Sequence, residues 1–298
     1  NGELLRVADG TVDVFFRTPW RTKKVTLAVQ RVVGAEAYDP LYYAAGTIGE
    51  HIVAQMTSAV ASGSKALFSS INHSSGSYAW NASNWVGADF TGRPVWNSAF
   101  GGVYNGAMIS PQHLLGAAHA APSIGSTVRF VTSAGATISR TVDSGSSIGG
   151  TDLRVLKLNA DVPGTIKWYK VLPANWTDYL KTIRLPIVAT DGAQQAITRE
   201  WYYSHNNLFV TDRTYSAGTF AALSENIIGG DSGSACFFLI NGELVLNGTH
   251  WANDGEAGVV SVHNMASSYT TEINSAMTTL GGGYQLTAYD LSGFANFG

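Results

Sequence analysis

The sequence predicts a mainly β protein of the sandwich or barrel type, and three observations carry this prediction. Beyond Trp96, strand-length apolar runs alternate with short turns rich in Gly, Ser, Asn and Asp. Charged residues make up only 13% of the 298 residues and the chain contains 33 glycines, a composition that favours strands and turns over long solvated helices. Hydrophobic residues reach 45%, enough to fill the core of one large domain or two small ones.

The first elements along the chain are predicted to be a β-hairpin. Residues 11–20 and 24–33 each contain apolar side chains in alternation, the pattern of a half-buried strand. Residues 21–23 are polar and are therefore expected to form the turn between them.

A helix follows the hairpin. Thr47 and Glu50 have the spacing of a capping box, and apolar residues then repeat every four positions up to Val60, before Gly63. From residue 69 to residue 94 no period is sustained, so this segment is expected to be irregular. Residues 1–85 are then an N-terminal extension with the role of a pro-segment, a packing arm or an oligomerisation arm.

The remaining elements are short strands and one terminal helix. Residues 271–280 repeat apolar side chains on one helical face, and Gly281 supplies a stop. The strands are predicted at residues 127–131, 136–142, 153–158, 182–189, 197–203, 208–211, 235–240 and 243–246.

A glycine-rich turn at residues 229–234 holds the strongest chemical signal of the chain. Its sequence, Gly-Gly-Asp-Ser-Gly-Ser, places Ser232 between Gly230 and Gly233. A serine hydroxyl becomes an effective nucleophile when a base removes its proton and donors hold the oxyanion that forms. Because Gly230 has no side chain, its N–H and that of Ser232 can converge as an oxyanion hole. An ordinary glycine-rich hairpin turn is the alternative.

A base and an orienting acid occur upstream, in the order His, Asp, Ser that is known for some acyl-transfer triads. His119 follows two alanines, which allow close packing beside an imidazole that faces a groove. A packed core histidine is the alternative. For the acid, Asp143 lacks a following apolar strand and Asp161 lies beyond one, whereas Asp152 stands at the mouth of an alternating strand. Asp152 is therefore the candidate.

These motifs resemble those of the chymotrypsin/trypsin-like serine proteases. The resemblance lies in Ala-Ala-His ending at His119, Thr-Asp-Leu around Asp152 and Gly-Asp-Ser-Gly around Ser232. It implies a serine endopeptidase domain at residues 86–298, with two antiparallel β-barrels at about 86–170 and 171–262. A C-terminal helix and tail complete it at 263–298. The implied roles are base, orienting acid and nucleophile for the three residues, with a protein or peptide as substrate.

In many members of that family the aspartate matching Asp231 is buried and pairs with a new amino terminus. No Ile-Val-Gly-Gly start occurs near residues 80–100 of this chain. Some bacterial relatives use an internal arginine instead, so Arg184 and Arg199 are the candidate partners of Asp231, since a buried carboxylate needs a cation or good hydrogen bonds.

A further resemblance concerns specificity. The run Asn-Gly-Thr-His-Trp at residues 247–251 is similar to the Gly-Ile-His-Trp run of glutamyl endopeptidases, in which the histidine lines the specificity pocket. The implied pocket residues are Asn226, Ile227 and His250. The resemblance implies Glu before the scissile bond. Asn226, Ile227 and Ile228 stand where glutamyl enzymes usually offer a hydroxyl, so an uncharged side chain, either Gln or a small one, is expected as the other preference. A buried structural role for His250 is the alternative.

Composition excludes several other functions. The net charge of −3 argues against a nucleic-acid surface, and no apolar run reaches the length of a membrane span. No His-Glu-x-x-His pattern, dinucleotide fingerprint or phosphate loop occurs, so no catalytic metal and no cofactor are expected. The single cysteine, Cys236, excludes an internal disulfide and is expected to be a small core residue.

The polar, lysine-poor composition indicates an extracellular or secreted protein, with virion association as a second possibility. A non-enzymatic role stays open as well, because a non-catalytic or self-processing assembly protein could use the same fold. The sequence does not indicate an oligomeric state.

Overall fold

The computed structural model describes residues 10–18, 21–29, 47–61, 63–95, 104–180, 184–202, 209–253 and 260–296. The chain divides into two compact units, Asn1–Asp39 and Pro40–Gly298. The predicted helix and the protease motifs all lie in the second unit.

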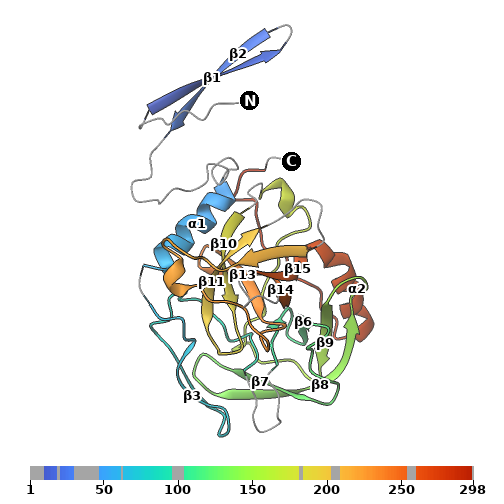
Figure 1. The fold of residues 1–298 in the computed structure, drawn as a ribbon. Helices are drawn as coiled ribbons and strands as arrows, with labels where there is room; N and C mark the ends of the chain where they lie inside the picture. Colours follow the sequence, from blue (N-terminus) through green and yellow to red (C-terminus); the bar gives the residue numbers. More distant parts are fainter. Residues whose placement is uncertain are drawn as a thin grey trace. The chain divides into compact units, whose positions relative to one another are not determined.

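The first unit contains the predicted hairpin, formed by β1 (Gly10–Thr18) and β2 (Arg21–Val29) (Figure 1). The two strands are antiparallel and Thr18 pairs with Arg21. Residues 21–23 therefore belong to the second strand, and the prediction that they form the turn is wrong. The reason is that β1 is long enough to supply a ladder partner for each of these polar residues.

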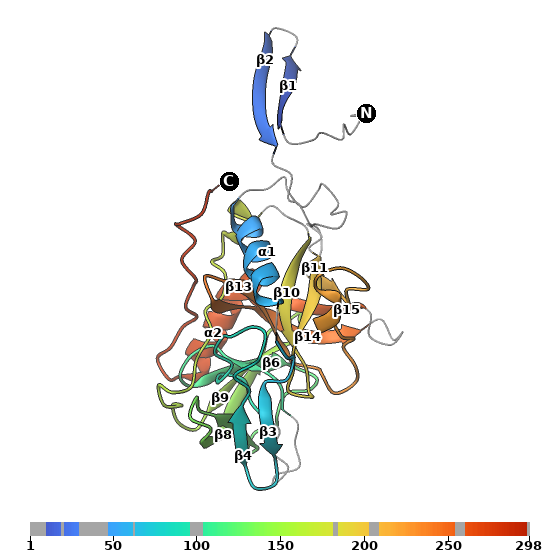
Figure 2. The same cartoon turned by 90° about the vertical axis from the view of Figure 1, so that its left-hand side faces the viewer.

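The second unit is built on two β-sheets (Figures 1 and 2). One is a closed barrel with the strand order β10-β11-β12-β15-β14-β13, and the other is a five-stranded sheet with the order β5-β6-β9-β8-β7. The five-stranded sheet forms a half-barrel, so only the second of the two predicted barrels is closed among the described residues. The predicted mostly β fold of the chymotrypsin type is confirmed.

All eight predicted strands are present: β7, β9 and β13 have the predicted ends, β10, β11 and β12 differ by one or two residues at an end, and β8 and β14 extend five and seven residues beyond the prediction. In the half-barrel, the strands are β5 (Ala107–Met108), β6 (His113–Ala117), β7 (Thr127–Val131), β8 (Thr137–Ser147) and β9 (Leu153–Leu158). In the closed barrel, they are β10 (Arg184–Thr190), β11 (Ala196–Tyr202), β12 (Phe209–Arg213), β13 (Ala235–Ile240), β14 (Glu243–Asn253) and β15 (Val260–Met265).

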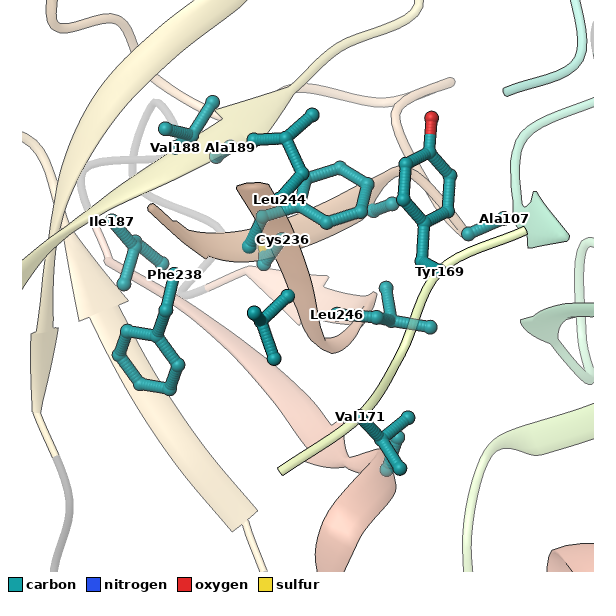
Figure 3. Close-up of a cluster of buried hydrophobic side chains, with 14 of the residues drawn as sticks. Ala107, Tyr169, Val171, Ile187, Val188, Ala189, Cys236, Phe238, Leu244 and Leu246 are labelled. Atoms are coloured by element: carbon teal, nitrogen blue, oxygen red, sulfur yellow. The ribbon is translucent and has the colours of Figure 1, made fainter. Parts of the chain in front are cut away.

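The barrel core explains why β13 reads as a continuous apolar run. All six of its residues are buried, because the closed barrel covers one face and neighbouring segments cover the other. Figure 3 shows Cys236 among apolar side chains that include Ile187, Leu244 and Leu246. The expectation that Cys236 is a buried residue is confirmed.

The helix α1 (Thr47–Ala59) packs on β10 and β13 of the closed barrel. Its four-residue repeat gives one buried face, on which Ile48, Ile52 and Met56 are fully inaccessible to solvent. At about 1.5–3 kcal/mol for each buried side chain, this contact is a substantial part of the stability of the unit.

A second short hairpin lies where the sequence predicts an irregular segment. It consists of β3 (Phe68–Asn72) and β4 (Ser77–Trp80). Only the first residue of β3 is buried, so the strand carries no alternating pattern and cannot be recognised from periodicity.

The terminal helix α2 (Thr270–Leu280) is present as predicted and packs against β8 and β9. It ends at Gly281, whose φ of +84° is a conformation that favours glycine. Neither helix in the described ranges has the length and hydropathy required to span a membrane.

Candidate active site

The three candidate triad residues lie at the ends of strands. His119 follows β6 and Asp152 immediately precedes β9, and the pairing of Ala117 with Leu153 places these two strand ends next to each other. Ser232 lies in the turn before β13, in the closed barrel. The site is therefore formed between the half-barrel and the closed barrel.

The side chains of these residues form a continuous hydrogen-bonded chain. The Nδ1 atom of His119 lies 2.7 Å from Asp152 Oδ2, and its Nε2 atom lies 2.9 Å from Ser232 Oγ. The backbone N–H of His119 donates to Asp152 Oδ1 at 3.1 Å, so both carboxylate oxygens hold the histidine. The His119 side chain is 47% exposed, against 10% for Asp152. This geometry suits general-base activation of a serine hydroxyl that is open to a substrate.

The turn that carries Ser232 depends on two glycines. Gly230 has a φ of +103° and Gly233 a φ of +83°. A side chain at Gly233 would meet the Ala117 nitrogen and the Asn105 carbonyl at 3.3 Å, so glycine is required both by conformation and by space. Within the described part of the chain, the N–H groups of Gly230 and Ser232, the predicted oxyanion donors, donate to no protein acceptor.

Asn105 is a component of the site that sequence reasoning missed. Its Nδ2 donates to the carbonyl oxygens of Gly230 at 2.9 Å and of Ser232 at 3.1 Å. The residue is 4% exposed and reaches across from the segment before β5. A carboxamide that binds two carbonyls of one turn fixes the orientation of the peptide planes that follow Gly230 and Ser232, and thereby the shape of the turn that carries Ser232. No local motif marks Asn105, because its partners are more than a hundred residues away.

Asn264 supports the acid in a similar way. Its Oδ1 accepts the backbone N–H of Asp152 at 2.9 Å, and Asn264 is buried on β15 of the closed barrel. This bond connects the strand end that carries the acid to the barrel that carries the nucleophile.

Asp231 is buried, but its partners differ from the predicted ones. Its carboxylate accepts the backbone N–H groups of Gly192 at 2.7 Å and of Ile228 at 2.8 Å. The prediction that Arg184 or Arg199 pairs with Asp231 is wrong. The Arg184 guanidinium lies over the ring of Tyr202, and Arg199 forms an ion pair elsewhere.

The cation that interacts electrostatically with Asp231 is Arg93, which the sequence analysis did not identify. It is 2% exposed, donates from Nη2 to the Asp191 carbonyl at 3.1 Å and interacts electrostatically with the carboxylates of Asp191 and Asp231. Burial lowers the pKa of Arg93, and these two carboxylates oppose that effect. Burial also raises the pKa of Asp191 to about 6.

A pocket of about 230 Å³ opens beside the Ser232 hydroxyl. Two of the three predicted pocket residues, Ile227 and His250, line it, whereas Asn226 does not and instead accepts a hydrogen bond from Thr214 at 2.7 Å. The complete lining is Ile227, Ile228, Gly229, Ser232, His250, Trp251, Ala252 and Asn253. The volume is below the range of about 300–1,000 Å³ typical of small-molecule sites, and it suits a single side chain.

Both ring nitrogens of His250 face protein groups. Nε2 lies 3.2 Å from Cys236 Sγ, and Nδ1 lies 3.3 Å from Ser261 Oγ. The residue is 1% exposed, and burial lowers the pKa of His250 to about 3 despite the nearby Asp212 carboxylate. The alternative of a buried structural histidine thus describes the surroundings of His250, although the residue also lines the pocket.

Asp212 and Arg199 form a fully buried ion pair behind that wall. Arg199 Nε donates to Asp212 Oδ1 at 2.8 Å, and both side chains are inaccessible to solvent. Burial opposes ionisation of Asp212 and is the largest influence on it. The Arg199 guanidinium, the two neighbouring histidines and the hydrogen bond from Ser261 together outweigh burial and hold the pKa of that carboxyl below its usual range.

Comparison with known proteins identifies the fold. No family model matches the sequence, and no curated protein matches it. Among solved structures, the chain is similar to a mutant of human heparin binding protein (CAP37), with a TM-score of 0.51 and 15% sequence identity. The match covers 66% of this chain and 95% of that one. At this identity the likeness establishes a chymotrypsin-like fold and leaves activity to the chemistry of the site.

Proposed function

We propose that this protein is a serine endopeptidase that acts through His119, Asp152 and Ser232. The observation that carries the proposal is the unbroken chain of contacts from Asp152 through His119 to the Ser232 hydroxyl. A fold alone supports many functions, but this order of acid, base and nucleophile is the arrangement that acyl transfer requires.

In this mechanism His119 Nε2 takes the proton of Ser232 as Oγ attacks the peptide carbonyl. Asp152 accepts the hydrogen bond from Nδ1, which fixes the tautomer and stabilises the imidazolium. The N–H groups of Gly230 and Ser232 stabilise the oxyanion, and donors of this kind typically contribute about 10²–10³ in rate each. His119 then protonates the leaving amine, and water hydrolyses the acyl-enzyme.

The pocket favours an uncharged residue before the scissile bond, either a small apolar side chain or glutamine. Ile227 and Ile228 present apolar surface, and the nitrogens of His250 are directed to Cys236 and Ser261. None of the described residues that line the pocket is an acid, a lysine or an arginine, so a charged side chain that entered would lose its hydration without gaining a partner of opposite charge from them, which is costly. Of the preferences that the sequence allows, glutamate is therefore the least favoured.

Labelling with a fluorophosphonate tests the activity directly, with intact mass as the readout. We expect a single covalent adduct on the wild-type protein and none on Ser232→Ala, because only an activated serine reacts. Ser234→Ala is the matched control, since it removes the neighbouring hydroxyl and is expected to label like wild type. A folded wild-type protein that takes no label would contradict the proposal and favour a non-catalytic role.

Peptides that differ only in the residue before the scissile bond then test the pocket. We expect kcat/KM for Gln, Ala or Val to exceed that for Glu, Asp, Lys or Arg by about tenfold or more. Equal or faster cleavage after Glu would show that the pocket supplies a positive partner and would overturn the assigned specificity.

A further inference from the structure

Four side chains inside the closed barrel converge at one point, and none of them belongs to the proposed triad. They are Asp212 on β12, His263 on β15, His250 on β14 and Cys236 on β13. These four strands are consecutive in the barrel order, so each neighbouring strand contributes one donor. All four residues are buried, with at most 1% of their surface exposed.

The donor atoms lie close together, at distances comparable with those between the ligands of a metal ion. One ligand atom from each residue lies within 4.8 Å of the others. Cys236 Sγ lies 3.2 Å from His250 Nε2, and Asp212 Oδ2 lies 4.0 Å from Cys236 Sγ and 3.9 Å from His263 Nδ1. Tetrahedral zinc with bonds of about 2.0–2.3 Å requires ligand separations of about 3.3–3.6 Å.

The second ring nitrogen of each histidine has a hydrogen-bonding partner outside the cluster. His263 Nε2 lies 3.2 Å from Asn247 Oδ1, an acceptor that favours a hydrogen on Nε2. The lone pair of His263 Nδ1 then points into the cluster, where this fully buried atom has no hydrogen-bond partner among the described residues. His250 Nδ1 lies 3.3 Å from Ser261 Oγ and 4.0 Å from Asp212 Oδ2, whereas its Nε2 is directed at Cys236. Outer partners of this kind orient metal-ligating histidines.

The carboxylate is oriented in the same way. Asp212 Oδ1 accepts hydrogen bonds from Arg199 Nε and from Ser261 Oγ, whereas Oδ2 faces the Nδ1 atoms of His250 and His263 and the Cys236 sulfur. One oxygen is thus held by the protein and the other is presented to the cluster.

We propose that Cys236, His250, His263 and Asp212 bind one zinc ion as a structural site in the closed barrel. One sulfur, two imidazole nitrogens and one carboxylate oxygen are ligands that zinc accepts, and four protein ligands leave no position open for substrate. The bound state has Cys236 as a thiolate, so its proton is released on binding. The inference stands independently of the proposed protease activity.

The ion would tie four adjacent strands together behind the pocket wall. Because the donors are buried, loading is expected to accompany folding. The sequence predicts no catalytic metal, and its pattern conceals this site because the ligands are separated by 24, 14 and 13 positions and meet only when the barrel closes.

Cobalt is the probe, since it substitutes for zinc and reports its ligands by absorption. The full chain is unfolded and refolded under reducing conditions with Co²⁺ alone. We expect one ion per chain, the strong visible bands of tetrahedral cobalt and a sulfur-to-cobalt charge-transfer band in the near ultraviolet. Cys236 is the only cysteine, so this last band can come from no other residue.

Two variants and two controls sharpen the assignment. Cys236→Ser is expected to lose the charge-transfer band, and His263→Gln to lose tetrahedral binding. His51→Gln, which alters a histidine on α1, and Ser232→Ala, which removes the proposed nucleophile, are expected to bind like wild type. If Cys236→Ser or His263→Gln fails to refold, the wild-type spectrum still decides. A refolded wild-type protein without the charge-transfer band, or a band that persists in Cys236→Ser, overturns the site.

Discussion

The protein places histidine beside aspartate in two very different settings. In the proposed active site, His119 is 47% exposed and lies between loop ends of two sheets. In the closed barrel, His250 and His263 are buried next to Asp212, which Arg199 already neutralises. The residue types are the same, but solvent reaches only the first pair.

This difference in exposure gives the proposed active site and the buried cluster different roles. An exposed imidazole can approach a substrate and exchange protons with water, as a general base must. A buried polar cluster cannot do either, and it persists only if its charges and donors are matched. Substitutions in the first region should therefore affect turnover, and substitutions in the second should affect stability.

The largest effect is expected at His119. His119→Ala removes the general base, and losing one triad member lowers kcat by about 10⁴–10⁶-fold. Because the side chain is half exposed, the free energy of unfolding should change by less than about 0.5–1 kcal/mol. Steady-state kinetics and urea denaturation measure the two quantities. A variant that retains a tenth of wild-type turnover would remove His119 from the mechanism.

At Arg199, in contrast, the main effect is expected on stability. Arg199→Met leaves the Asp212 carboxylate buried without its cation, which should lower the free energy of unfolding by about 3–5 kcal/mol. Lys157→Met is the matched control, because it breaks the ion pair with Asp143, whose side chain is 51% exposed, and should cost less than about 1 kcal/mol. Equal losses of unfolding free energy in the two variants would mean that the buried ion pair contributes no more to stability than the exposed one.

A smaller effect is expected at Asn105, which touches the catalytic turn without contacting a substrate. Asn105→Ala releases the carbonyls of Gly230 and Ser232, and we expect kcat to fall by about 10–100-fold with little change in KM. The rate of fluorophosphonate labelling should fall in parallel. Asn81→Ala is the control: it removes a similar hydrogen bond, from the Asn81 side-chain amide to the Ala66 carbonyl, away from the site, and it should keep wild-type rates. A change confined to stability would assign Asn105 a structural role only.

The smallest effect concerns pH and Asp191. Burial raises the pKa of Asp191 to about 6, so between pH 4 and 6 the folded state binds a proton that the unfolded state has released. Stability from this group is therefore highest below pH 4 and falls as pH rises through 6, by at most about 3 kcal/mol. Asp191→Asn keeps an acceptor for the Gln195 N–H and removes the titration.

Urea denaturation of wild type and Asp191→Asn at pH 4 and at pH 7 tests the predicted titration of Asp191. The free energy of unfolding of Asp191→Asn minus that of wild type should be larger at pH 7 than at pH 4. A difference that does not vary with pH would show that Asp191 does not titrate in this window.

Much of the fold follows from local patterns. The apolar run of β13, the alternation in β9 and the four-residue repeat of α1 were all sufficient to place these elements, because each is buried on a face that its own period defines. The hairpin formed by β3 and β4 was not predicted, because mostly exposed strands carry no such period.

The candidate triad could be recognised from sequence because each member lies in a short motif of small residues. Their mutual contact was an inference from order alone, and the distances come from the packing of two sheets. Asn105, Asn264 and Arg93 carry no motif, since their partners are distant in the chain.

By itself, the sequence determined the β-rich class, the two helices and the residues most suited to acyl transfer, because these depend on composition, period and local spacing. Only the tertiary structure decided the partners of Asp231, the burial of His250 and the cluster around Asp212. Those depend on barrel closure, which brings residues from four strands to one point and excludes water from it.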